Sequence, residues 1–158
     1  MENCAENMEE FKNQSESFFR EIRSIEIYRS SDVSYINAFN GIFPHRSKAL
    51  FTFKIVPETL SRSVNSKRRI GNDFTEVDIS FPLLDLSLEN IKKCEENFNR
   101  KGFVIIEVTN ADKILYGNSR EPLQIDFIDN RLNNNSGDDE YTIAISGETI
   151  IKPKIQIL

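Results

Sequence analysis

The residue types that most often do chemistry in proteins are scarce in this chain and poorly placed for it. His45 is the only histidine, and it lies in the polar stretch "FPHRS". Without a second histidine or paired cysteines, it completes neither a nucleophile–base pair nor a zinc site. Cys4 and Cys94 are far apart and fit no CxxC or metal-ligand spacing. We therefore expect a solvated or locally hydrogen-bonded His45 and two reduced thiols.

The carboxylates and glycines show no catalytic or binding pattern either. Asp138, Asp139 and Glu140 are consecutive, and charge runs of this kind usually lie on solvated surfaces. When Gly137 is aligned with the invariant glycine of an EF-hand loop, Leu132 falls on the first ligand position, so the calcium pattern fails. The glycines form neither a dinucleotide-binding motif nor a P-loop. The expectation is a protein that is not an enzyme, with no catalytic residue, cofactor or metal site.

One basic cluster, formed by Lys67, Arg68 and Arg69, lies between two predicted strands and is followed by the turn sequence Gly71-Asn72. We expect it at the tip of a long β-hairpin. Three interpretations are open: a solvated loop, a contact loop that pairs with an acidic surface, and a nucleic-acid contact. The last is disfavoured because no aromatic residue interleaves with the basic ones. Identical subunits with a basic tip and an acidic body could associate head to tail and would form a ring if the rotation closes.

The bulk composition is that of one globular domain. The chain has 158 residues, enough to bury a core without disulfides. Its formal net charge of −5 disfavours sequence-specific nucleic-acid binding, because affinity for a duplex depends on neutralising phosphates. No apolar run is long enough to span a membrane, and the N-terminus lacks the basic and apolar parts of a signal peptide. We expect a protein that is not exported and has no membrane partner.

Two segments are expected: residues 1–20 as an N-terminal acidic arm, and residues 21–158 as a single β-rich domain. The arm would be a helix or would order on a partner. Alternating apolar residues predict most of the strands of the domain. The predicted strands span residues 22–28, 50–56, 73–81, 103–108, 114–116, 122–129, 141–146 and 154–158. Gly147 is expected to end the strand 141–146. Residues 60–66 are predicted to be a weak continuation of the strand 50–56. The 103–108 segment is apolar on nearly both faces, which places it at the centre of the sheet.

One helix is predicted near residues 87–100. Ser87 is the expected N-cap, and Gly102 is the expected residue after the C-terminal end because glycine takes a positive φ at little cost. Leu88 and Phe98 are expected on the side that packs on the sheet. Several strands joined by short loops, with a single helix, indicate an α+β fold. We expect a mostly antiparallel β-sandwich or partly closed barrel with one flanking helix.

Four stretches in the later part of the chain follow a recognisable order. They are Phe81-Pro82, Val104 to Val108, Leu115 to Gly117 and Tyr141 to Gly147. Their order resembles that of uncharacterised proteins encoded among the tail and structural genes of phages and prophages of Bacteroides-type bacteria, with crAss-like phages a candidate source. The first 47 residues lie outside the shared pattern, and "ILYGN" lacks the double leucine that is usual in it.

The resemblance implies a structural virion protein, made in the host bacterial cytoplasm and found in the virion. Phage tail-tube and connector proteins often use a β-sandwich or barrel with a flanking helix, assembled as rings around the DNA channel. The implied partners are copies of the protein itself in a ring and other phage tail, neck or portal proteins. Lys67, Arg68 and Arg69 would then be the candidate subunit-contact loop. The alternative is a non-enzymatic accessory binding module or adaptor, because a fold alone does not establish a role.

Overall fold

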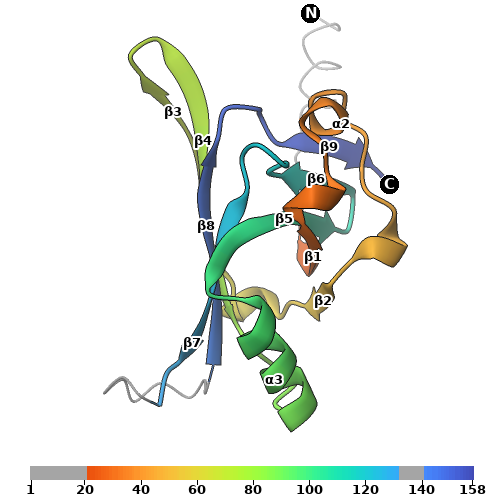
Figure 1. The fold of residues 1–158 in the computed structure, drawn as a ribbon, viewed down its shortest axis with the longest axis vertical. Helices are drawn as coiled ribbons and strands as arrows, with labels where there is room; N and C mark the ends of the chain where they lie inside the picture. The colour runs from red at the N-terminus through yellow and green to blue at the C-terminus, as the bar shows by residue number, and fades with distance from the viewer. Residues whose placement is uncertain (1–20, 132–140) are drawn as a thin grey trace, which may run out of the picture.

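The computed structural model describes residues 21–131 and 141–158 of the chain. In these ranges the polypeptide forms a mostly antiparallel β fold, in which one sheet curls into a half-barrel and one longer helix lies at its lower end (Figure 1). The expected α+β class is confirmed, in the form of a partly closed barrel. The expected acidic arm, residues 1–20, lies outside the described residues, as does the stretch 132–140 with its acidic run.

The strands and helices follow the predicted order along the chain. The strands are β1 (Ile22–Arg29), β2 (Phe51–Lys54), β3 (Ser61–Arg69), β4 (Asn72–Pro82), β5 (Arg100–Thr109), β6 (Asp112–Tyr116), β7 (Leu123–Asp129), β8 (Tyr141–Thr149) and β9 (Lys154–Ile157). The α-helices of the described ranges are α2 (Tyr35–Phe39) and α3 (Leu88–Asn97), with short 3-10 turns at Ser30–Asp32, Arg46–Lys48 and Pro57–Thr59.

The sheet branches at β5. Its main path runs β2-β1-β5-β7-β8-β4-β3, while β6 and β9 form a side branch. One edge of β5 pairs with β1; on the other edge, Arg100–Phe103 pairs with β7 and Ile105–Val108 pairs with β6. Phe103 to Ile106 are buried, which confirms the central position of this strand. β2 and β3 lie at opposite ends of the path, so residues 60–66 do not continue the 50–56 ribbon as expected.

Hydrophobic clusters cover both faces of the central strands. The larger cluster fills the half-barrel with inward-facing residues of most strands, at the alternate positions that an apolar–polar alternation predicts. Its members include Val77, Ile79 and Phe81 of β4, Leu123, Ile125 and Phe127 of β7, Tyr141, Ile143 and Ile145 of β8, and Cys94 and Phe98 near α3. The smaller cluster lies between β1, β5 and β6 and the segment around α2, and it includes Tyr28, Val33, Val104 and Ile106.

Helix α3 begins as predicted and ends earlier than predicted. The Ser87 hydroxyl accepts a hydrogen bond from the Asn90 amide, so the expected N-cap is confirmed. The helix stops at Asn97, and Asn99 takes the positive φ of 66° that was assigned to Gly102. Asn99 does so because its side chain accepts a hydrogen bond from the Phe127 amide and thereby ties the chain to β7. Gly102, with a φ of 152°, instead lies at an irregularity inside β5.

Two further expectations about single residues are wrong. Leu88 does not pack on the sheet: it is 86% exposed, because the first turn of α3 extends past the core, whereas Phe98 is buried as expected. Gly147 does not end its strand, since β8 continues to Thr149. A Cβ atom at Gly147 would lie 2.6 Å from Leu123 Cδ2, so this glycine allows close packing of β7 against β8.

An ion pair between a partly exposed arginine and a buried glutamate joins the last strand of the main path to the branching strand β5. Glu107 of β5 is completely buried, and its carboxylate accepts hydrogen bonds from Arg62 Nε at 2.8 Å and Arg62 Nη2 at 3.0 Å. The Tyr116 hydroxyl of β6 also donates to Glu107 and accepts from Arg62 Nη2 at 2.8 Å. The hydrogen bonds to Glu107 raise the pKa of the Arg62 guanidinium, and burial, reinforced by the Glu107 charge, raises the pKa of the Tyr116 phenol. Both groups therefore keep their protons at neutral pH.

Replacing Arg62 by Met should destabilise the fold by about 3 kcal/mol, because it leaves the Glu107 carboxylate buried without its cation. Chemical denaturation measures the change in the free energy of unfolding. The matched control is Lys67→Met, which breaks an exposed ion pair with Glu76 and should change stability by less than about 1 kcal/mol. Adding Glu107→Leu to Arg62→Met should recover part of the loss, and a double variant less stable than the single one would contradict this account.

Cys94 should make stability fall at alkaline pH. Burial raises the pKa of its thiol from 9.0 to about 11, so the folded chain holds a proton that the unfolded chain has released between these values. Its contribution is therefore complete below pH 9.0 and is lost as the pH rises to about 11. The measurement compares the pH dependence of unfolding for the Cys4→Ser chain with that of Cys4→Ser combined with Cys94→Ala. Parallel curves for the two chains above pH 9.0 would show that the thiol makes no such contribution.

Candidate functional site

The β3–β4 hairpin is the most prominent projection of the described fold. Its strands pair in register from Ser61↔Ser80 to Arg69↔Asn72. The third strand, β8, pairs with β4 only as far as Thr75. The eight residues 67–74 therefore extend beyond the sheet as a two-stranded ribbon, which forms the upper left end of the molecule in Figure 1. An isolated two-stranded ribbon buries little apolar surface and is marginally stable. We call residues 67–74 the hairpin tip.

The structure places the predicted basic residues on this ribbon, and it pairs each of them within the chain. Lys67 lies 2.8 Å from Glu76, and Arg68 lies 3.0 Å from Asp73. Arg69 lies 3.8 Å from Glu148 and also places its guanidinium 4.9 Å from the centre of the Phe74 ring. The position on a hairpin is therefore confirmed, but the turn is formed by Ile70 and Gly71 and not by Gly71 and Asn72, since Asn72 already belongs to β4. Pairs within the chain replace the free positive patch. Exposed pairs of this kind contribute little to stability.

Ile70 is the feature of the hairpin that sequence reasoning missed. It is 97% exposed and has a positive φ of 48°, and Gly71 after it has a φ of 79°. Two positive φ values between paired strands define a type I′ turn, whose first position strongly favours Asn, Asp or Gly. A β-branched residue there is strained as well as exposed. The pairing of Arg69 with Asn72 leaves a two-residue turn, Ile70-Gly71. In such a turn Asn-Gly is the usual sequence, so the isoleucine was the sign of an unusual turn.

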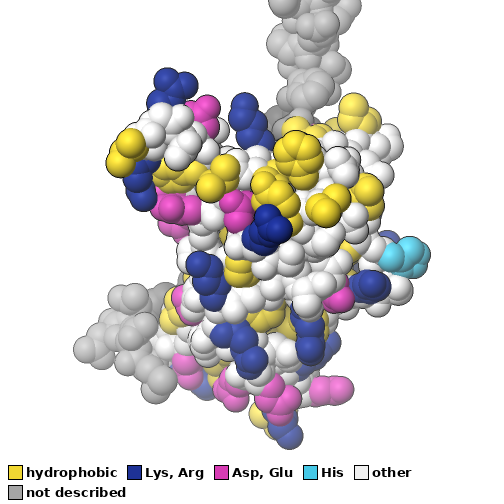
Figure 2. All heavy atoms as spheres, turned by 45° about the horizontal axis from the view of Figure 1, so that its top comes forward, with side chains coloured by type: hydrophobic (Ala, Val, Ile, Leu, Met, Phe, Trp, Pro, Cys, Tyr) yellow, Lys and Arg dark blue, Asp and Glu magenta, His cyan; other side chains and the backbone are white. Residues whose placement is uncertain are grey.

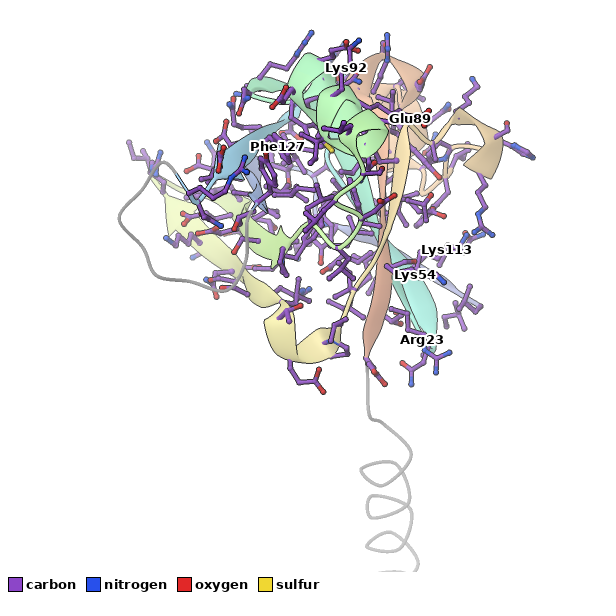
Figure 3. All side chains as sticks on the ribbon, turned by 90° about the horizontal axis from the view of Figure 1, so that it is seen from below. Arg23, Lys54, Glu89, Lys92, Lys113 and Phe127 are labelled. Carbon is purple, nitrogen blue, oxygen red and sulfur yellow. The ribbon has the colours of Figure 1, made fainter. Side chains whose placement is uncertain are left out.

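Other parts of the surface hold two further groups of residues that the sequence did not bring together. Arg23, Lys54 and Lys113 come from β1, β2 and β6 and lie on one flank of the sheet in Figure 3. None of the three forms an ion pair with a residue in the described ranges. Apolar side chains gather near the top of the molecule in Figure 2, around α2 and β9. The large exposed ones there include Ile36, Phe39, Ile42, Ile155 and Ile157.

The remaining candidates for chemistry behave as solvated or structural groups. His45 is exposed, and its Nδ1 lies 2.7 Å from the Ser47 hydroxyl and accepts from the Ser47 amide, as a local hydrogen-bonding role predicted. Across residues 21–131 and 141–158, no three His, Cys, Asp or Glu side chains are grouped so that they could hold a metal ion. The described part of the chain also contains no helix with the length and apolar character needed to cross a membrane.

Comparison with known proteins gives no relative for this chain. No protein-family model, no curated protein and no solved structure matches it.

Replacing Ile70 by Asn should stabilise the isolated chain by about 1 kcal/mol, because Asn relieves the strain of a β-branched residue in the left-handed region. Thermal and chemical unfolding measure the effect. Ile70→Val is the matched control, since it keeps the branched Cβ and should leave stability unchanged. A loss of stability in Ile70→Asn would show that the Ile70 side chain stabilises the single chain, which would contradict the account of it as strained and exposed.

Proposed function

We propose that the chain is a structural protein of a bacteriophage virion, a subunit of a tail or neck ring or tube around the DNA channel. The observation that supports this best is Ile70, a strained and almost fully exposed isoleucine at the end of a projecting ribbon. Within one chain, this residue lowers stability and solubility together. A backbone outlier of this kind is a reason to look for a function outside the fold of the single molecule.

Contact with another protein would explain both the backbone strain and the exposure of Ile70. Burial of its side chain in an apolar surface of a neighbour would be worth about 2 kcal/mol, which offsets the strain of the turn. The branched Cβ also fixes the side-chain direction, so that little conformational entropy is lost when it docks. The hairpin tip therefore has the properties of a preorganised contact arm.

The charge pairs of the hairpin tip fit the same role. Lys67, Arg68 and Arg69 lie within reach of Glu76, Asp73 and Glu148, so the ribbon carries little net charge of its own. Copies of the chain would then approach one another without repulsion between their tips. The long guanidinium groups of Arg68 and Arg69 are largely exposed, and their remaining N–H groups are free to bind carboxylates of a partner.

The assignment to a virion rests on the resemblance of four stretches of the sequence to phage tail-region proteins. A ring or tube is the expected product when one face of a subunit binds a different face of the next. The net charge of −5 would suit a channel through which DNA passes without sticking. Terminase, portal and capsid genes beside the gene for this chain would support this class of function, and neighbours of one metabolic pathway would count against it.

The second candidate is a non-enzymatic binding module or adaptor. It is favoured by the exposed apolar side chains around α2 and β9, which would form a binding surface for another protein. This function predicts a stable monomer or dimer rather than a larger assembly of identical chains.

The proposed self-association should depend on Ile70. Mass photometry and sedimentation of the full chain should show oligomers that grow with concentration, and Ile70→Asn should weaken association about tenfold or more. Ile70→Val and Ile36→Asn are the controls: the first keeps an apolar tip, and the second removes an exposed isoleucine elsewhere. A wild-type chain that stays monomeric at high concentration, or an Ile70→Asn chain that assembles like the wild type, would contradict the proposal.

A further inference from the structure

Strand β9 has one free edge, since it pairs with β6 and with no other strand of the described fold. In an antiparallel ladder, every second residue directs its N–H and C=O groups to the partner strand. The Leu158 amide donates to the Ala111 carbonyl across this ladder at 3.1 Å, which fixes the alternation. The N–H and C=O groups of Ile155 and Ile157 therefore point away from β6, and within the described residues they form no hydrogen bond.

The free edge of β9 lacks the features that usually protect a sheet edge from pairing with another chain. Exposed cations are one such feature, and the other edge strands have them: Lys54 on β2, and Arg68 on β3. On β9, Ile155 and Ile157 share one face of the sheet and are 57% and 83% exposed. The edge therefore combines unpaired backbone groups with apolar side chains, which are the properties of a strand that adds to another sheet.

Helix α2 adds apolar surface on the other face of β9. Lys154 lies on that face because side chains alternate along a strand, and its ammonium lies 5.5 Å from the centre of the Phe39 ring of α2. Ile36 and Phe39 of this helix are both exposed. Figure 2 shows the apolar side chains gathered in this region. A strand laid along the free edge would therefore find apolar side chains on both faces of the sheet.

A second copy of β9 complements this edge. When two β9 strands pair antiparallel about a two-fold axis at Gln156, Ile155 of each copy lies opposite Ile157 of the other. These are the residues with outward backbone groups, so each such pair exchanges both of its N–H···O bonds. The isoleucines of both copies then lie together on one face. A two-fold axis at Ile155 would instead set Ile157 opposite Pro153, which has no N–H to donate.

The charges near β9 are too far apart to oppose this pairing. About the axis at Gln156, Lys154 lies opposite Leu158 of the other copy. The two Lys154 residues are then separated by about 14 Å along the strands, more than the Debye length of about 8 Å at physiological salt. Lys113 is the partner of Gln156 within the chain, so it lies about three strand spacings, again about 14 Å, from its equivalent. The contact therefore depends on backbone hydrogen bonds and apolar side chains.

We propose that two copies of the chain pair through β9, antiparallel about a two-fold axis at Gln156, so that their sheets join. This contact goes beyond the proposed function, because it uses neither Ile70 nor any other residue of the hairpin tip. It is isologous and closed: each edge takes one partner, so it joins two chains, or two rings of chains, and grows no further. The contact is smaller than a standard interface, so we expect the free dimer at high protein concentration.

A cysteine on the axis tests the register directly. In the Cys4→Ser chain, Gln156→Cys should form a disulfide-linked dimer with an added thiol oxidant. Residues that face each other in a non-hydrogen-bonded pair have Cα atoms about 4.5 Å apart, which suits a disulfide. Lys154→Cys is the matched control, since its two copies would be about 14 Å apart. On non-reducing electrophoresis, no dimer from Gln156→Cys, or an equal amount from Lys154→Cys, would overturn the inference.

A proline on the free edge tests the contact in solution. Ile157→Pro removes an N–H that points away from β6, so it should leave thermal unfolding nearly unchanged. Sedimentation of the Ile70→Asn chain, which lacks the proposed tip contact, should show dimers, and adding Ile157→Pro should weaken them about tenfold or more. Ile150→Ser, which removes an exposed isoleucine elsewhere, is the control and should leave the dimers unchanged.

The two contacts can fail separately. An Ile70→Asn chain that is monomeric at high concentration, or one whose dimers persist with Ile157→Pro, would overturn the β9 contact and leave the proposed function standing. If Ile157→Pro alone removes all association and Ile70→Asn changes nothing, the β9 contact is supported and the proposed function fails.

Discussion

The two ends of the half-barrel meet at the completely buried carboxylate of Glu107. A charge on the central strand needs a cation, and in the described fold that cation is supplied by Arg62 from the last strand of the main path. The curl of the sheet brings β3 to face β5, so that Arg62 reaches Glu107, and the Tyr116 hydroxyl completes the site. This contact fixes the inner half of β3. The outer half has no such attachment and is left to extend past the core as the hairpin tip.

Sequence patterns predicted those parts of the fold that depend on local chemistry. The alternation of Val77, Ile79 and Phe81 identified the inner face of β4, and the Ser87 hydroxyl identified the start of α3. The curl was not predictable, because Arg62 and Glu107 lie 45 residues apart and neither is unusual in its own segment. The end of α3 was misplaced for a related reason: the side chain of Asn99 binds β7, a contact that no rule about the helix alone contains.

In the candidate site too, the features set by local sequence were predictable, and those set by distant residues were not. The position of Lys67, Arg68 and Arg69 on a hairpin followed from turn chemistry, whereas their pairing depended on which residues faced them across the ribbon and in β8. Ile70 escaped notice because its strain appears only when the strand register is known. An Asn-Gly turn at this position would be more stable than Ile70-Gly71. The isoleucine in this turn therefore lowers the stability of the single chain, a cost that the proposed contact would explain.

The branch at β5 determines how mechanical load would pass through the molecule. A force applied at the hairpin tip enters β4, crosses the ladders to β8 and β7, and reaches the first half of β5 at Arg100–Phe103. From there it passes into β1 along the other edge of the same strand. The side branch of β6 and β9 is attached to the second half of β5 and lies off this path of ladders, although Tyr116 of β6 also accepts a hydrogen bond from Arg62 of β3. Because β9 pairs with β6 alone, loss of this C-terminal strand would leave the ladders between the hairpin tip and β1 intact.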